Sequence, residues 1–316
     1  MSNDGAIMHK VFIDGQAGTT GLRIHALLRA RGDIELLEID AARRKDAAAK
    51  LELIRAADLT ILCLPDEAAR ETVAMAGRDA RILDASTAHR VSPGWVYGLP
   101  ELTSNQRTAI RNSNRVSNPG CYPTGFLLAL APLVRVRLVP ADACITVNAI
   151  SGYSGGGNKL IEKYQGSERP AALRPYGLHL AHKHIPEMQT WAGLEHPPLF
   201  VPAVADFYQG MLVNVPLCIR QIEGNDPGAG ILAAWRESYK DEAWIRVHPL
   251  NDFAEPVDGY LDPELNNGGN FVDLFCYATK EHTLLIARLD NLGKGAAGAA
   301  VQNLNLMLGC DESAGL

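Results

Sequence analysis

The turn around Cys121 combines residue types that could form a covalent bond to a substrate. Residues 117–124 read Ser-Asn-Pro-Gly-Cys-Tyr-Pro-Thr, so the cysteine stands among turn residues at the start of a helical stretch. The positive end of a helix favours the thiolate, which is the nucleophilic form of cysteine. We therefore expect Cys121 to be a nucleophile, the alternative being a structural cysteine in a turn. The other five cysteines lie in apolar runs or near the C-terminus, which predicts buried or C-terminal thiols in a reducing compartment.

A second reactive segment is His182-Lys183-His184-Ile185-Pro186-Glu187. One interpretation is a general acid/base histidine whose ring is oriented by Glu187. A metal site is the second interpretation, because an HxH pair in a strand points both rings to one face, but a third ligand is not evident nearby. Ordinary surface histidines before a proline-initiated helix are the third. The sequence by itself leaves these open.

Two glycine-rich loops could bind anions. Gly15-Gln16-Ala17-Gly18-Thr19-Thr20-Gly21 follows a strand-like run and opens a helical one, the context in which helix N–H groups hold the pyrophosphate of a dinucleotide. The spacing GxxGxxG departs from the usual GxGxxG, and a plain tight turn is the alternative. Residues 151–157 (Ser-Gly-Tyr-Ser-Gly-Gly-Gly) form either an anion-binding nest or a flexible connector.

The cofactor type is open on local sequence. Asp40, where the second strand is expected to end, would suit the ribose 2′-hydroxyl of NAD. Arg43, Arg44 and Lys45 follow directly and would suit the 2′-phosphate of NADP. A solvated basic helix face is the alternative for these three residues.

The elements that position these residues alternate regularly at first. Residues 9–15, 34–39, 59–64 and 81–84 are strand-like, and residues 18–31, 41–56 and 66–76 between them are helical. This predicts an α/β Rossmann-type, doubly wound parallel sheet. Beyond Asn118 a helix over 125–134 and β-rich runs over 143–150, 210–220, 271–278 and 282–289 predict a second, α+β domain with a mostly antiparallel sheet. The tail, residues 295–308, is expected to be an amphipathic helix that packs back on the first domain.

The amino-acid composition limits the classes of partner that the protein is expected to bind. The 316 residues carry a net charge of −6 and only 6% aromatic residues, which disfavours nucleic acid and anionic lipid. No apolar run reaches the roughly 18 residues that span a bilayer, and Met1 to Gly5 is polar. We expect no membrane association and a cytoplasmic protein with a small-molecule substrate.

Taken together, four motifs resemble one enzyme family. SNPGCYPT, SGYSGGG, HKHIPE and Asp290-Asn291-Leu292-Gly293-Lys294-Gly295-Ala296-Ala297-Gly298 look like the short (type 2) class of N-acetyl-γ-glutamyl-phosphate reductases, across essentially the whole chain. The resemblance implies a Rossmann domain for NADP(H) over 1–120, completed by the C-terminal helix 294–316, and a catalytic and dimerisation domain over 121–293. It also implies a homo-oligomer, a dimer or a tetramer.

The implied reaction is the NADPH-dependent reduction of N-acetyl-L-glutamyl 5-phosphate to the 5-semialdehyde in arginine biosynthesis, through a cysteine thioester and without a metal. By this resemblance Cys121 is the nucleophile and His184 the acid/base, while the substrate contacts are His182, Glu187, Ser151 and Gly152. We expect the cofactor contacts to be Gly15, Gly18, Thr19, Thr20, Gly21, Arg43, Ser86 and Asn291.

One stretch departs from the family pattern. Long-class members usually carry a DLSADFR-like stretch where this chain has residues 84–90, Asp-Ala-Ser-Thr-Ala-His-Arg, which leaves the roles of Ser86 and Arg90 open. An aspartate-semialdehyde dehydrogenase-like enzyme is the closest alternative. A cysteine hydrolase and an NADP-sensing module are more distant ones.

Overall fold

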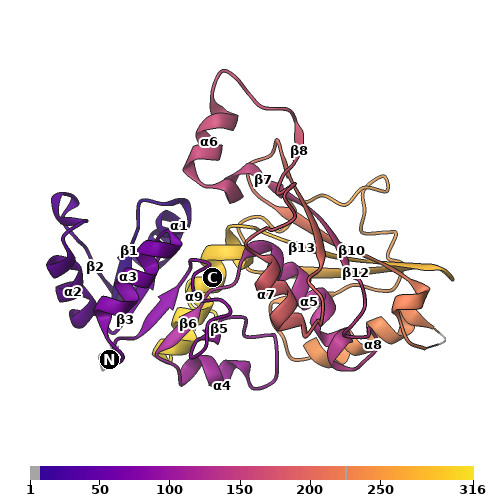
Figure 1. The fold of residues 1–316 in the computed structure, drawn as a ribbon, viewed down its shortest axis with the longest axis horizontal. Helices are drawn as coiled ribbons and strands as arrows, with labels where there is room; N and C mark the ends of the chain where they lie inside the picture. The colour runs from indigo at the N-terminus through magenta and orange to yellow at the C-terminus, as the bar shows by residue number, and fades with distance from the viewer. Residues whose placement is uncertain (1–7, 225) are drawn as a thin grey trace, which may run out of the picture. The chain divides into compact units, whose positions relative to one another are not determined.

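The computed structural model describes residues 8–224 and 226–316, so the polar stretch Met1 to Gly5 lies outside the described residues. The chain divides into two compact units (Figure 1). Unit 1 contains the described part of Met1–Pro100, Ser104–Pro119 and Ala296–Leu316. Unit 2 contains Glu101–Thr103 and Gly120–Gly295.

Unit 1 is built on a six-stranded, fully parallel sheet of order β2-β1-β3-β4-β6-β5. From β1 the chain moves to β2 on one side and then to β3 on the other, so the strand order reverses at the carboxyl end of β1, where open α/β sheets bind their ligands. The strands are β1 His9–Asp14, β2 Ile34–Leu37, β3 Leu59–Leu62, β4 Ile82–Asp84, β5 Val96–Tyr97 and β6 Arg115–Ser117.

Three of the four helices between these strands fall where the sequence predicted helices, and the fourth, between β5 and β6, was not predicted. They are α1 Thr19–Arg29, α2 Ala47–Ala56, α3 Asp66–Ala76 and α4 Gln106–Arg111. The single helix expected over 41–56 is wrong. The Asp46 side chain accepts hydrogen bonds from the N–H groups of Ala48 and Ala49 and so begins a new helix, leaving only a 3₁₀ turn at Ala41–Arg43.

The C-terminal helix α9 (Gly298–Leu308) belongs to the core of unit 1. The expectation of an amphipathic helix is wrong, because every residue from Gly298 to Met307 is buried. Its polar side chains find partners inside the unit: Asn303 donates to the Gly98 carbonyl and Gln302 to Glu312. Its apolar side chains share one cluster with β1, α1, β3 and β4, in yellow beside indigo and purple in Figure 1.

Unit 2 contains a seven-stranded mixed sheet of order β11-β12-β13-β10-β7-β9-β8. Four of its six strand pairs are antiparallel, so the mostly antiparallel sheet expected here is confirmed. The strands are β7 Thr146–Gly152, β8 Leu173–Pro175, β9 Leu199–Ala205, β10 Met211–Cys218, β11 Ile245–Val247, β12 Val272–Ala278 and β13 His282–Leu289. Its helices are α5 Cys121–Arg135, α6 Asn158–Gln165, α7 Ile185–Ala192 and α8 Pro227–Tyr239.

The central helix α5 lies against β10 and β13 and starts four residues earlier than expected, at Cys121. Pro132 lies inside it and has no N–H, so the carbonyl of Leu128 loses its donor within the helix. The Tyr239 hydroxyl of α8 donates to that carbonyl at 2.7 Å. Trp235, also from α8, donates to the neighbouring Ala129 carbonyl at 2.8 Å. The two donors compensate for the proline.

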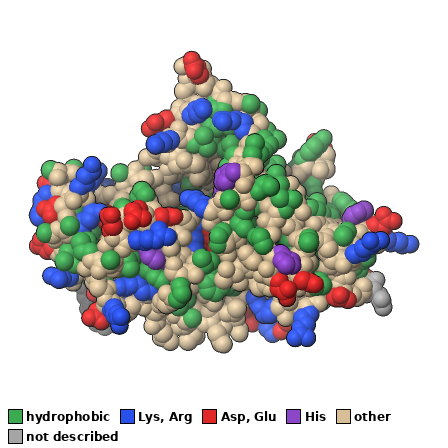
Figure 2. Space-filling model, viewed as in Figure 1, with side chains coloured by type: hydrophobic (Ala, Val, Ile, Leu, Met, Phe, Trp, Pro, Cys, Tyr) green, Lys and Arg blue, Asp and Glu red, His purple; other side chains and the backbone are tan. Residues whose placement is uncertain are grey.

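The surface carries both acidic and basic side chains (Figure 2). Acidic and basic side chains are interspersed on the face seen in Figure 2. Within residues 8–224 and 226–316, every helix is too short or too polar to cross a membrane. All six cysteines are reduced thiols, but Cys144 and Cys218 are exposed, which corrects the expectation of burial. Cys218 ends β10 on its exposed side, and Cys144 lies two residues before the first residue of β7.

Candidate active site

The cysteine predicted to be the nucleophile is the first residue of α5. Gly120 is the N-cap of this helix, in an extended conformation. The Gly120 carbonyl accepts from both the N–H and the hydroxyl of Thr124, which fixes the first turn. Cys121 is half-buried, and the helix N-terminus beside it favours its thiolate form. The local geometry is suited to a reactive thiol.

Glu187 joins this turn to the histidine segment. His184 is the N-cap of α7, Pro186 occupies the first turn, and the Glu187 side chain is 1% exposed. One carboxylate oxygen of Glu187 accepts the Gly120 N–H at 3.2 Å, and the other lies 4.0 Å from Nε2 of His184. The carboxylate therefore orients the histidine and the residue before the cysteine at once.

The two histidines lie beside an aromatic cluster. The rings of His182 and His184 are 4.7 Å apart, and both contact Tyr122. The Tyr176 hydroxyl donates to the Tyr122 hydroxyl at 3.2 Å. Burial raises the pKa of Tyr176 to about 12 and that of Tyr122 well above its usual value, so both phenols stay protonated at neutral pH.

The loop over residues 151–157 is ordered rather than a flexible connector. The N–H groups of Gly152, Tyr153 and Ser154 all donate to backbone carbonyls between residues 207 and 210. A nest for an anion would therefore need other groups of this loop. Ser151 is buried, and its hydroxyl donates to the Gly152 carbonyl at 3.1 Å.

Asn291 holds the same loop in place. Its amide donates to the Ser154 hydroxyl at 3.0 Å, and its oxygen accepts the Gly210 N–H at 2.7 Å. Asn291 belongs to unit 2, while the glycine loop expected to share a cofactor with it belongs to unit 1. Both ends of its side chain have partners within unit 2.

The glycine loop after β1 fits a bound pyrophosphate. Gly15 has φ +90°, and a Cβ there would lie 2.2 Å from the Cys63 carbonyl oxygen. A Cβ on Gly21 would lie 2.7 Å from the Gly15 carbonyl oxygen, so packing of the loop requires both glycines. A Cβ on Gly18 would meet only one atom, at 3.6 Å, although Gly18 is the N-cap of α1. Gly18, Thr19 and Thr20 thus form a helix N-terminus, the kind of structure whose N–H groups bind phosphate.

Asp40, the acidic residue considered for a ribose contact, accepts a hydrogen bond within its own turn. β2 ends at Leu37, three residues before Asp40, and the Asp40 carboxylate accepts the Ala42 N–H at 2.8 Å. Arg43 is exposed and pairs with Asp46 at 3.2 Å. Arg44 and Lys45 are exposed beside it. The basic residues, rather than Asp40, are presented to solvent here.

The stretch that departs from the family pattern forms a buried turn after β4. The Asp84 carboxylate accepts from the N–H and hydroxyl of Ser86 and lies 2.6 Å from Nδ1 of His89. The Ser86 hydroxyl also accepts the Ala88 N–H. Arg90 donates to the Asn118 carbonyl at 2.9 Å, which fixes the strand end that leads to the cysteine turn. Ser86 and Arg90 thus both stabilise backbone.

The sequence interpretation missed a buried ion pair whose lysine directly precedes a glycine that packs against Cys121. Lys294, in the π-helical turn Gly293–Ala297, donates to Glu101 at 2.7 Å. A Cβ on the next residue, Gly295, would lie 2.8 Å from Cβ of Cys121. A lysine between two glycines was the available signal. Its partner, 193 positions away, could not be found from spacing.

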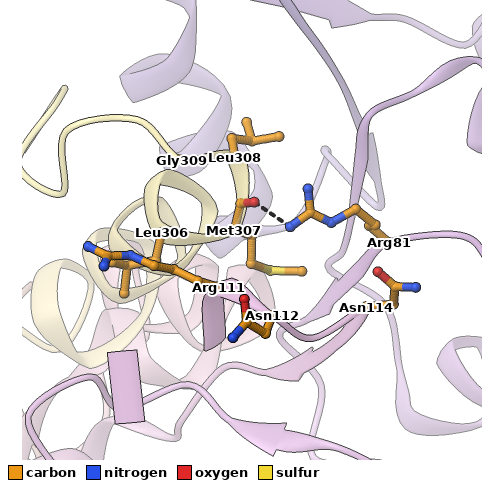
Figure 3. A pocket seen from close by; sticks show the side chains of 8 residues that line it. All are labelled: Arg81, Arg111, Asn112, Asn114, Leu306, Met307, Leu308 and Gly309. Atoms are coloured by element: carbon orange, nitrogen blue, oxygen red, sulfur yellow. Dashed lines mark hydrogen bonds between the residues drawn. The ribbon is translucent and has the colours of Figure 1, made fainter. Parts of the chain in front are cut away.

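The open cavity in Figure 3 contains none of the predicted site residues. It measures about 480 Å³ and lies where β4 and β6 begin and α9 ends. Its Arg81 donates to the Met307 carbonyl, which satisfies the end of that helix. We therefore assign this arginine a structural role. Among the described residues, no group of three His, Cys, Asp or Glu side chains could hold a metal ion.

Comparison with known families decides the classification. Residues 10–111 match the model of the semialdehyde dehydrogenase NAD binding domain, and residues 121–291 match the semialdehyde dehydrogenase dimerisation domain. N-acetyl-γ-glutamyl-phosphate reductase 2 of Nostoc sp. is 50% identical over 97% of this chain and 99% of its own length. The chain belongs to the N-acetyl-γ-glutamyl-phosphate reductase family. The resemblance stated from the motifs is confirmed.

Other relatives agree. The reductase 2 of Pseudomonas putida is 48% identical over 96% of this chain and 98% of its own length. A probable aspartate-semialdehyde dehydrogenase from Pseudomonas aeruginosa has the same fold, with a TM-score of 0.69 and 17% identity over 95% of this chain and 98% of that one. The aspartate semialdehyde dehydrogenase from Candida albicans, solved with NADP, has a TM-score of 0.67 and 14% identity over 95% of this chain and 98% of that one. The two-part α/β fold is thus confirmed, and its first domain binds a nicotinamide cofactor.

Proposed function

We propose that this enzyme reduces N-acetyl-L-glutamyl 5-phosphate to N-acetyl-L-glutamate 5-semialdehyde, releasing phosphate, in arginine biosynthesis. The observation that carries the proposal is the bridge made by Glu187, which joins the Cys121 turn to His184 through Gly120. A thiol at a helix N-terminus beside an oriented histidine is the arrangement needed for acyl transfer. The relatives are named N-acetyl-γ-glutamyl-phosphate reductases, and this name is the basis for proposing an acyl phosphate as the substrate.

Cys121 and His184 carry the covalent step in this proposal. The Cys121 thiolate attacks the acyl carbonyl, the bond between that carbon and the phosphate oxygen breaks, and a thioester remains on the sulfur. His184 takes the thiol proton and later donates a proton to the oxygen of the reduced carbon. It takes that proton back as the carbon–sulfur bond breaks, which releases the aldehyde and returns Cys121 as the thiolate. Glu187 keeps the imidazole in place throughout, because it is buried and also anchored by the Gly120 N–H.

The cofactor in this proposal is NADP(H), which supplies the hydride that reduces the thioester carbon. The N–H groups at the start of α1, with Gly15, Gly18, Thr19, Thr20 and Gly21, would hold its pyrophosphate. Arg43 would bind the 2′-phosphate. Two observations support this: Arg43 is exposed, and the Asp40 carboxylate is hydrogen-bonded to the Ala42 N–H of its own turn. Ser86 and Asn291 would contribute to cofactor binding by fixing their own loops, Ser86 through Asp84 and Asn291 through Ser154.

We also propose how the two units divide the work. Cofactor binding belongs to residues 1–120 with the C-terminal segment 294–316, which contains α9, and catalysis and dimerisation to 121–293. A homo-oligomer, dimer or tetramer, is favoured by the match to a dimerisation domain. The six reduced thiols favour a cytoplasmic setting.

The deciding experiment assays the full chain with NADPH and two acyl phosphates, N-acetylglutamyl phosphate and aspartyl phosphate. We expect kcat/KM to be at least about 10²-fold higher for the first, as for sites that recognise an added polar group. In the Cys121→Ser variant turnover should fall to background, because a hydroxyl is a far weaker nucleophile at neutral pH. Near-normal turnover by that variant would rule out the thioester.

A further inference from the structure

His182 and His184 differ in their hydrogen bonds. Nδ1 of His182 accepts the backbone N–H of His184 at 3.1 Å. An imidazole nitrogen that accepts a hydrogen bond carries no proton, so the proton of the neutral ring lies on Nε2. A proton on Nδ1 would place two N–H groups head to head and break this bond. The backbone of His184 therefore selects the neutral Nε2–H tautomer of His182.

The ring of His182 is fixed by three aromatic neighbours. Tyr122, Tyr176 and Phe200 meet it edge-to-face, with centroids 6.3, 5.7 and 5.1 Å away and interplanar angles of 89°, 63° and 83°. Such pairs have a preferred geometry, so together they restrict rotation of the imidazole. His182 is only half-buried, whereas His184 is 7% exposed. Of the two rings, His182 is therefore the one with more surface open to a ligand.

Tyr176 is the neighbour that comes from outside the packed core. It follows the edge strand β8, and its N–H donates to the Pro202 carbonyl of β9. Its hydroxyl donates to Tyr122, which in turn donates to the Ala203 carbonyl at 3.4 Å. This chain of hydrogen bonds fixes the phenol whose ring faces His182.

We propose that His182 is a neutral hydrogen-bond donor that binds an oxygen of the acyl-phosphate substrate through Nε2–H, and that Tyr176 is the positioning residue that holds its ring. The inference rests on the proposed function, in which His184 transfers the protons. The two histidines of one motif then have separate tasks. One binds and the other exchanges protons.

Amide substitutions separate these tasks. Glutamine at position 182 can place an N–H donor near the position of Nε2, whereas asparagine reaches only as far as Nδ1. We expect His182→Gln to keep kcat/KM within about 10-fold of wild type and His182→Asn to lose about 10²-fold, mostly through KM. At position 184 both amides should lose about 10²-fold in kcat, because neither exchanges protons. Equal losses for the two variants at position 182 would overturn the proposal.

Tyr176 is tested by what its ring and its hydroxyl do separately. Tyr176→Phe keeps the ring contact but loses the hydroxyl that fixes the ring, so KM should rise by about 3-fold, whereas Tyr176→Leu loses the ring as well and should raise KM about 10-fold with kcat and its pH profile unchanged. Tyr260→Phe is the matched control, since that side chain is 78% exposed. A loss in kcat for Tyr176→Leu with an unchanged KM would contradict the positioning role.

The tautomer can be read without turnover. Nitrogen NMR of the full chain with ¹⁵N-labelled histidine, with the His182 signals identified by their loss in His182→Asn, should show a protonated Nε2 and a bare Nδ1 at pH 7. An imidazolium or an Nδ1–H form would refute the proposal. This measurement stays valid even if the acyl-phosphate assay fails, so the two failures are distinguishable.

Discussion

Nζ of Lys294 lies 2.7 Å from Oε1 of Glu101, and both side chains are fully buried in unit 2. The pair ties the short segment Glu101–Thr103 to the π-helical turn that begins at Gly293. Because the next residue of that turn packs on the Cys121 side chain, the ion pair helps to fix the wall beside the sulfur.

Removing one partner of this pair should destabilise the protein strongly. Lys294→Met removes the ammonium that lies 2.7 Å from the buried Glu101 carboxylate, and losing one partner of a buried pair costs about 3–5 kcal/mol of unfolding free energy. The double variant Lys294→Met with Glu101→Leu removes both charges and should recover most of that loss. Urea unfolding measures both. A double variant as unstable as the single one would contradict this account.

Gly295→Ala should impair catalysis more than stability. The added Cβ would lie 2.8 Å from Cβ of Cys121, so the cysteine must move. A displacement of about 1 Å at a reacting group costs on the order of 10²-fold in rate, and we expect that loss in kcat. Gly32→Ala is the control, because no atom lies within 4 Å of a Cβ there. Normal kcat in Gly295→Ala would show that this wall is not needed.

His248 should make stability depend on pH. Burial lowers its pKa, but hydrogen bonds to Asp273 and Asp252 outweigh burial, so the pKa is raised overall. A raised folded-state pKa means that the contribution is full below the unfolded value of about 6.5 and is lost as pH rises through the folded value. His248→Gln should therefore lower the Tm at pH 5.5 and change it little at pH 9. The opposite order in thermal unfolding would contradict the sign.

Tyr239→Phe should reveal the carbonyl that Pro132 leaves without a helical donor. The variant keeps the ring in place and removes only the hydroxyl that donates to Leu128. A buried carbonyl without a partner costs about 1–3 kcal/mol, and chemical denaturation should show a loss in that range. Tyr260→Phe, at an exposed tyrosine, should show none.

Arg43 should discriminate between the two nicotinamide cofactors. Arg43→Ala should raise KM for NADPH about 10-fold and leave KM for NADH within about 2-fold, since the charge pair is made only to the 2′-phosphate. Arg55→Ala, on the exposed side of α2, is the matched control. Equal kcat/KM for NADPH and NADH in the wild-type enzyme would overturn the NADP assignment.

Local signals account for what could be predicted from sequence. The first four strands of unit 1 and the helices between them follow from periodicity, which is a property of neighbouring residues, whereas the short elements β5, α4 and β6 were not predicted. The break at Asp46 had a local signal too, an aspartate before an alanine run, but helical composition outweighed it. The burial of α9 had none, since Asn303 and Gln302 look solvent-facing until their partners, Gly98 and Glu312, are known.

The residues of the candidate site also fall into two groups, those with a local sequence signal and those without one. Cys121 and the HxH segment were found because unusual residue types lie close together in the sequence. Tyr176 was not found, because its contact with Tyr122 spans 54 positions and an edge strand. The tautomer of His182 depends on one backbone N–H, a detail of geometry that no residue type encodes.

The position of α9 has a consequence for how the chain is made. Its side chains complete the apolar cluster that contains Val11 and Ile13 of the first strand. A ribosome adds these residues only after all of unit 2 has been synthesised. The first unit to be synthesised is therefore the last that can close its core, and until then its strands lack the apolar side chains of α9. A stop codon before residue 296 would leave that core permanently incomplete.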